Sequence, residues 1–170
     1  GDAWVFLWED PPAEPHRLTV LGLRADGEWV TLGRVLVKGI EPGTGVWTGV
    51  LTRPVPDAAR LEEVVRRYFD LTARGRFAEA WELVHPQSRR PNPGIPEEEA
   101  RAAFLARPPG PGLEAILGMQ LRASIKFHWC MCILREVAEV LVRREDGSTE
   151  EVYALRDEGG AWRVLVLWDS

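Results

Sequence analysis

Short apolar runs separated by polar turns dominate the first third of the chain. The strand-sized runs are Trp4–Trp8, Arg17–Arg24, Trp29–Val37 and Val46–Thr52. Asp26-Gly27, between the second run and the third, is a strong β-hairpin signal. Pro54 and Pro56 then interrupt the pattern, because proline cannot donate to a strand ladder. The pattern therefore predicts an N-terminal β segment over residues 1–53, either a small subdomain or an extension of a larger sheet.

Helical periodicity begins after these prolines. From Ala58 apolar residues recur at spacings of three and four, which predicts an amphipathic helix that ends at Gly75. Asp57 is a good N-cap, and we expect its carboxylate to accept hydrogen bonds from the free amides of the first turn. A second helix is expected over Phe77–Val84, before a proline that cannot continue it. A third helix is expected to begin at Pro96 and to end at the PPGPG segment.

The last part of the chain again has a strand pattern. We expect one long or bulged strand over Leu121–Leu134 and a neighbouring strand over Arg135–Arg144. A hairpin turn at residues 145–148 leads to an expected strand over Thr149–Arg156, and a second turn at residues 157–160 leads to one over Ala161–Trp168. Both turns contain glycine. Three helices followed by an antiparallel meander predict an α+β fold, preceded by the N-terminal β segment.

Two segments carry a family resemblance. VVRRYFDLTARGRFAEAWELVHPQSR (Val64–Arg89) resembles the opening helices of NTF2-like domains, and EVLVRREDGSTEEVYALRDEGGAWRVLVLW (Glu139–Trp168) resembles their final hairpins. The resemblance covers residues 57–170 and is nearest to small or lipoprotein-borne domains of bacteria. It implies three N-terminal helices of the domain packed on a curved antiparallel sheet, which forms a cone with a hydrophobic pocket. It also favours an extracytoplasmic, envelope-associated location.

The sequence FHWCMC (residues 127–132) holds both cysteines of the chain. On a single strand, His128, Cys130 and Cys132 would share one face and larger apolar side chains the other. Two apolar faces would require cover on both sides of the sheet. His128 and Cys132 would lie roughly 13 Å apart along such a strand, too far to bind one metal ion. We therefore expect no metal and no cofactor, and we expect the cysteines to be buried free thiols.

Pocket candidates follow from the resemblance and from the residue types. The expected ligand pocket comprises Tyr68, Trp81, Phe104, His128, Cys130 and Cys132. His128 is the first candidate for a general base, because the unperturbed pKa of histidine is near 6.5. Asp70 and Tyr68 are further catalytic candidates. For His128 a hydrogen-bonded core position is the alternative, and for Asp70 a solvated helix surface.

Composition narrows the function classes. The chain of 170 residues is 45% hydrophobic and carries a net charge of −5 without a basic cluster, which disfavours nucleic-acid binding. Its apolar runs are too short to span a bilayer. We expect a non-enzymatic module that binds an apolar small ligand or a protein partner, with homodimerisation through the sheet. The alternatives are a small-molecule isomerase, dehydratase or hydrolase, and an accessory domain of a larger envelope protein.

Overall fold

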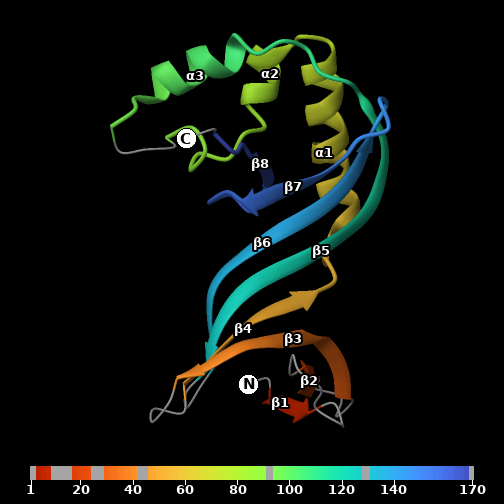
Figure 1. Ribbon diagram of the computed structural model, residues 1–170, viewed down its shortest axis with the longest axis vertical. Helices are drawn as coiled ribbons and strands as arrows, with labels where there is room; N and C mark the ends of the chain where they lie inside the picture. The colour runs from red at the N-terminus through yellow and green to blue at the C-terminus, as the bar shows by residue number, and fades with distance from the viewer. Residues whose placement is uncertain are drawn as a thin grey trace. The chain divides into compact units, whose positions relative to one another are not determined.

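The computed structural model of the chain describes residues 3–8, 17–23, 29–41, 46–90, 94–127 and 131–168 (Figure 1). The helices are α1 (Ala58–Ala73), α2 (Phe77–Trp81) and α3 (Glu97–Leu105). The strands are β1 (Ala3–Trp8), β2 (Arg17–Leu23), β3 (Trp29–Glu41), β4 (Val46–Arg53), β5 (Leu113–Phe127), β6 (Met131–Arg144), β7 (Thr149–Arg156) and β8 (Trp162–Leu165). The fold is therefore α+β, as the element pattern predicts.

The position of the helices in the chain corrects one part of the predicted fold. They lie between β4 and β5, and hydrogen-bonded strand order follows chain order from β1 to β8. Because β4 pairs with β5, strands precede and follow the helices within one run of antiparallel pairs. The prediction of three helices ahead of the sheet is therefore wrong.

The chain forms two compact units. The first combines residues 1–55 with 120–137, and the second combines residues 56–119 with 138–170. Strands β5 and β6 therefore each contribute one half to either unit. The predicted boundary between residues 53 and 57 lies beside the point where the chain first passes from one unit to the other.

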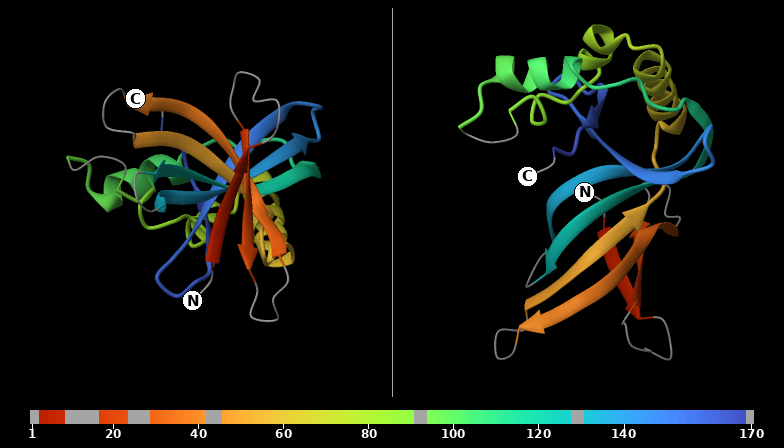
Figure 2. Two further views of the ribbon diagram at one scale, coloured as in Figure 1. Left: turned by 90° about the horizontal axis from the view of Figure 1, so that it is seen from below. Right: turned by 45° about the horizontal axis from the view of Figure 1, so that its top comes forward.

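The first unit is an antiparallel meander in which β1 to β4 are neighbours in chain order, followed by β5 (Figure 2). Register shifts interrupt β2–β3 pairing at Val20/Leu21 and β3–β4 pairing between Val37 and Gly39. Gly33 is required at its place in β3, because a Cβ there would lie 2.5 Å from a carbonyl oxygen of β4. The unit also contains a bidentate ion pair from Arg53 to Glu136, at 2.8 and 2.7 Å.

The second unit buries the apolar face of α1. Leu61, Val65 and Phe69 are buried at the helical spacing that the sequence predicts. A cluster around Trp81 and Phe104 from α2 and α3 extends this core, and both side chains are almost fully buried. Helix α2 is shorter than predicted, because its last residues leave the helix for a strand-like contact with β8. The Val164 amide donates to the Leu83 carbonyl, and the His85 amide donates to the Val164 carbonyl, both at 2.8 Å.

The turn glycines behave as predicted. Gly75 follows α1 with φ +71°, and the glycines of the two hairpin turns, Gly147 and Gly160, have φ values of +83° and +80°. All three positions use the left-handed region that glycine tolerates without a steric cost.

Asp57 stands at the N-cap position of α1 but does not cap it with its side chain. Its Oδ1 instead accepts hydrogen bonds from Arg156 Nη2 at 2.7 Å and from the indole Nε1 of Trp162 at 3.0 Å. Both donors belong to the β7–β8 hairpin. The predicted capping bond is therefore wrong, and the carboxylate joins the start of α1 to the hairpin.

The long strand predicted over Leu121–Leu134 is also wrong. β5 runs from Leu113 to Phe127, and a separate strand begins at Met131. Phe127 and Met131 therefore belong to different strands. His128 and Cys130 lie outside the described residues.

Candidate functional site

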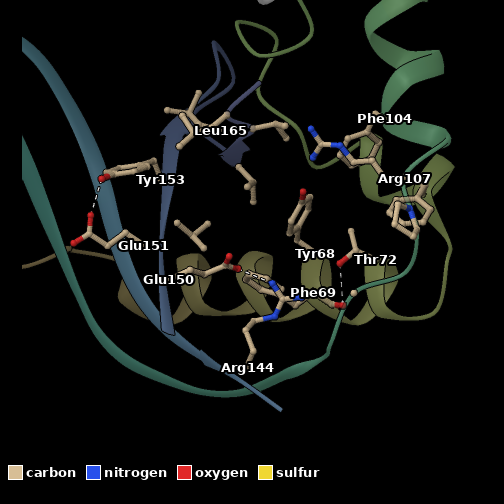
Figure 3. A pocket seen from close by; sticks show the side chains of 17 residues that line it. Tyr68, Phe69, Thr72, Phe104, Arg107, Arg144, Glu150, Glu151, Tyr153 and Leu165 are labelled. Carbon is tan, nitrogen blue, oxygen red and sulfur yellow. Dashed lines mark hydrogen bonds and ion pairs between the residues drawn. The ribbon is translucent and has the colours of Figure 1, made fainter. Parts of the chain in front are cut away.

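A cavity in the second unit opens where β8 ends and its neighbour β7 continues. The β7–β8 register ends at the pair Tyr153 and Leu165. Beyond this pair, residues 166–168 are bonded to the buried Ser88 instead of to β7. The Ser88 Oγ accepts a hydrogen bond from the Val166 amide at 3.0 Å, and the Ser88 carbonyl oxygen accepts one from Trp168 Nε1 at 2.7 Å. We call the resulting cavity, with a volume of about 280 Å³, the β7 pocket (Figure 3).

The part of β7 beside this cavity has no β8 neighbour. In an antiparallel ladder, successive residues of a strand bond alternately to one neighbour and to the other. The Arg144 amide donates to the Ser148 carbonyl, so even-numbered residues of β7 bond to β6. The backbone N–H and C=O of Glu151 therefore face the side that β8 has left, where Glu151 lines the pocket.

Aromatic side chains form the apolar wall of the β7 pocket. Tyr68 and Phe69 of α1 meet edge to face, with ring centroids 5.6 Å apart. The Phe104 ring of α3 lies 6.4 Å from Tyr68 and 5.8 Å from Phe77. Such edge-on and tilted ring contacts hold an apolar surface in a defined shape.

Arg144 is a structural cation at the edge of this wall. Its Nη1 pairs with Glu150 Oε1 at 2.6 Å, and its remaining guanidinium nitrogens donate to the Pro111 carbonyl. The guanidinium carbon also lies 4.4 Å from the centre of the Phe69 ring. These contacts use the charge and most of the donors of Arg144.

Arg107, which follows α3, is held differently. Its guanidinium carbon lies 5.3 Å from the centre of the Phe104 ring and 5.0 Å from that of Trp168. Within the described part of the chain, no carboxylate pairs with it. Cation–π contacts leave the guanidinium N–H donors unused, because those donors lie in the plane of the group.

The hydroxyl of Tyr68 points into the cavity, on the same side as the Arg107 guanidinium (Figure 3). Burial raises the pKa of Tyr68 above its ordinary value, while the positive charge of Arg107 acts in the opposite direction. Glu150 adds to the rise and Arg144 opposes it. The hydroxyl has no hydrogen-bond partner among the residues the structure describes.

The structure brings together two of the predicted pocket residues, Tyr68 and Phe104. Trp81 lies behind Phe104 in the core, with ring centroids 5.2 Å apart, and does not line the β7 pocket. Asp70 is exposed and pairs with Arg74 at 2.8 Å. Side chains two positions apart on an α-helix point about 200° away from each other. Asp70 therefore leaves α1 on the side opposite Tyr68.

The remaining predicted site residues belong to the FHWCMC segment. His128 and Cys130 lie outside the described residues. Cys132 is in β6, but beyond the part of the chain whose side chains are described. Their assignment to a pocket stays a prediction.

Sequence reasoning missed Arg107, Arg144 and Glu150. The spacing of Phe104 and Arg107 puts them on one helical face, which is the one signal for their contact that the sequence holds. Arg144 and Glu150 flank a hairpin turn, where charged residues are ordinary. Neither position is distinguished before the packing of α1 and α3 is known.

The described ranges contain neither a candidate metal cluster nor a membrane-spanning helix. No group of three or more His, Cys, Asp or Glu side chains that could hold a metal ion occurs among the described residues. No helix in the described ranges is long and apolar enough to cross a membrane.

No protein-family model, curated protein or solved structure matches this chain. The resemblance of the two sequence motifs to NTF2-like domains therefore stays a prediction.

Proposed function

We propose that the chain is a binding module of the NTF2-like kind, and that its β7 pocket receives a small ligand with an apolar body. The support for the family is the resemblance of Val64–Arg89 and Glu139–Trp168 to NTF2-like domains, and in the structure α1 packs against β8. The observation that carries the function is the aromatic wall of Tyr68, Phe69 and Phe104 around an open cavity. Ligand pockets in proteins are mostly apolar with a few placed polar groups.

The carboxylates at the pocket favour binding over catalysis. Glu150 is paired with Arg144 at 2.6 Å, and Glu151 accepts the hydroxyl hydrogen bond of Tyr153 at 2.8 Å. A general base needs a free proton-accepting site within reach of its substrate. Both acids are instead engaged by side chains of the same unit.

The test is a screen of small aromatic and aliphatic fragments by protein-observed NMR. We expect amide shifts to cluster at the C-terminal turn of α1, at β7 and around Phe104. Thr72→Phe fills the cavity from α1 and should abolish these shifts. Ala73→Phe introduces the same side chain outside the pocket and should leave them. Fragments that bind Thr72→Phe and the parent chain equally would exclude this pocket as the binding site.

A further inference from the structure

Among the residues whose burial the structure describes, the half-buried arginines follow a consistent pattern with one exception. Those with a carboxylate partner in the described residues are Arg53, Arg89, Arg143, Arg144 and Arg163. Arg107 is also half-buried, but its guanidinium lies against the Phe104 and Trp168 rings and has no carboxylate partner among the described residues. Since charges are costly to remove from water without a partner, its position favours an anion supplied from outside.

The Tyr68 hydroxyl is a second, independent indication of a ligand with a hydrogen-bond acceptor. A partly buried phenol usually has a hydrogen-bond partner, and the Tyr68 hydroxyl has none in the described part of the chain. Its environment keeps the phenol protonated, because burial raises its pKa. The group is therefore a neutral O–H donor directed at open space beside a cation.

The surroundings limit the charge of the anion. Glu150 and Glu151 also line the β7 pocket, and the whole chain carries a net charge of −5. One unpaired guanidinium among these acids matches a single negative charge better than two. The planar guanidinium fork also fits the two oxygens of a carboxylate.

We propose that the β7 pocket binds a small monocarboxylic acid whose aromatic or aliphatic body packs on Phe69 and Phe104. The carboxylate pairs with the Arg107 guanidinium and accepts a hydrogen bond from the Tyr68 hydroxyl. A cavity of about 280 Å³ restricts the ligand to a compact molecule. This ligand class deepens the function proposed above and depends on it.

The experiment compares phenylacetate with phenylacetamide, which share a ring and differ in charge. Titration calorimetry and NMR shifts at pH 7 give both affinities and the site of binding. Hydrogen bonds to a charged group stabilise a complex by about 1.5–3 kcal/mol, so we expect the acid to bind roughly ten- to a hundredfold more tightly.

Variants test whether Arg107 and Tyr68 cause the preference for the acid over the amide. Arg107→Gln should remove it by weakening the acid alone, and Arg107→Lys should retain a part of it, because the charge remains while the fork is lost. Arg101→Gln on the exposed face of α3 changes the net charge equally, and the preference should remain. Tyr68→Phe should weaken phenylacetate about tenfold through one lost charge-assisted hydrogen bond. Cooperative unfolding of each variant shows that its fold is retained.

The outcomes separate the two proposals. Equal binding of acid and amide in the β7 pocket overturns the carboxylate proposal and leaves the binding function in place. A preference for the acid that Arg107→Gln leaves unchanged also overturns it. Absence of shifts in the pocket with both probes and with the whole fragment panel overturns both proposals.

Discussion

The Asp57 carboxylate offers a sharp test of the difference between a helix cap and a tertiary contact. Serine is as good an N-cap as aspartate, so Asp57→Ser should be nearly neutral if the carboxylate capped α1. In the structure the side chain instead accepts from Arg156 and from Trp162. A serine hydroxyl is too short to replace either bond. We therefore expect Asp57→Ser to destabilise the second unit.

The expected loss follows from the exposure of the two donors. The Arg156 side chain is 44% exposed and that of Asp57 24%, so their ion pair contributes about 0.2–1 kcal/mol. Trp162 is only 5% exposed, and a buried indole N–H without an acceptor costs about 1–3 kcal/mol. The free energy of unfolding should fall by about 2–3 kcal/mol, which lowers the urea midpoint by about 1 M.

Urea unfolding followed by circular dichroism measures this change. Asp70→Ser is the matched control, because Asp70 is an exposed aspartate of the same helix, and its loss should cost less than about 0.5 kcal/mol. In a Trp162→Phe background the cost of Asp57→Ser should fall to the contribution of Arg156 alone. A stability of Asp57→Ser within about 0.5 kcal/mol of the parent chain would refute the tertiary contact.

Three other measurements follow from the described contacts. Phe104→Ala should lower the free energy of unfolding by about 3–5 kcal/mol, because Phe104 is fully buried among aromatic rings; a loss below about 1 kcal/mol would contradict that packing. Gly33→Ala should lower the free energy of unfolding by about 1–3 kcal/mol, since the new Cβ would lie 2.5 Å from a carbonyl oxygen of β4. Gly118→Ala is the control and should be tolerated, because a Cβ there has no neighbour within 4 Å. Similar losses of stability for both variants would be evidence against the close approach at Gly33. The pKa of Tyr68 should lie above the ordinary value for tyrosine. Spectrophotometric titration of the Tyr153→Phe variant measures this pKa directly, because the chain has two tyrosines and only Tyr68 then remains. The stabilisation from the buried neutral phenol is complete below pH ~10 and disappears as the pH rises through the folded-state pKa, and an ordinary pKa would show that Tyr68 is not buried.

Local rules predicted the elements whose signals lie within one turn or one helix. The spacing of Leu61, Val65 and Phe69 placed α1 correctly, since a helix buries every third or fourth residue wherever it packs. Gly147 and Gly160 marked both hairpin turns, because the turn itself requires positive φ.

The sequence-based predictions are wrong where residues distant in the chain determine the local structure. Residues 127–132 contain no Gly, Pro, Asn or Asp, so nothing local indicates that β5 ends there. Asp57 satisfies the local rule for a cap, but donors from the β7–β8 hairpin compete for its carboxylate. In the same way Arg107 owes its place to Trp168, which reaches it only through the packing of the second unit.

The division of β5 and β6 between the two units has a consequence for synthesis. Strand β4 needs residues 121–127 of β5 as its partner, and the ribosome makes residues 56–119 in between. Until then, the growing chain presents β4 as a free strand edge rich in apolar residues, which is a template for wrong pairing. The first unit can therefore complete its sheet only after the three helices of the second unit have been synthesised.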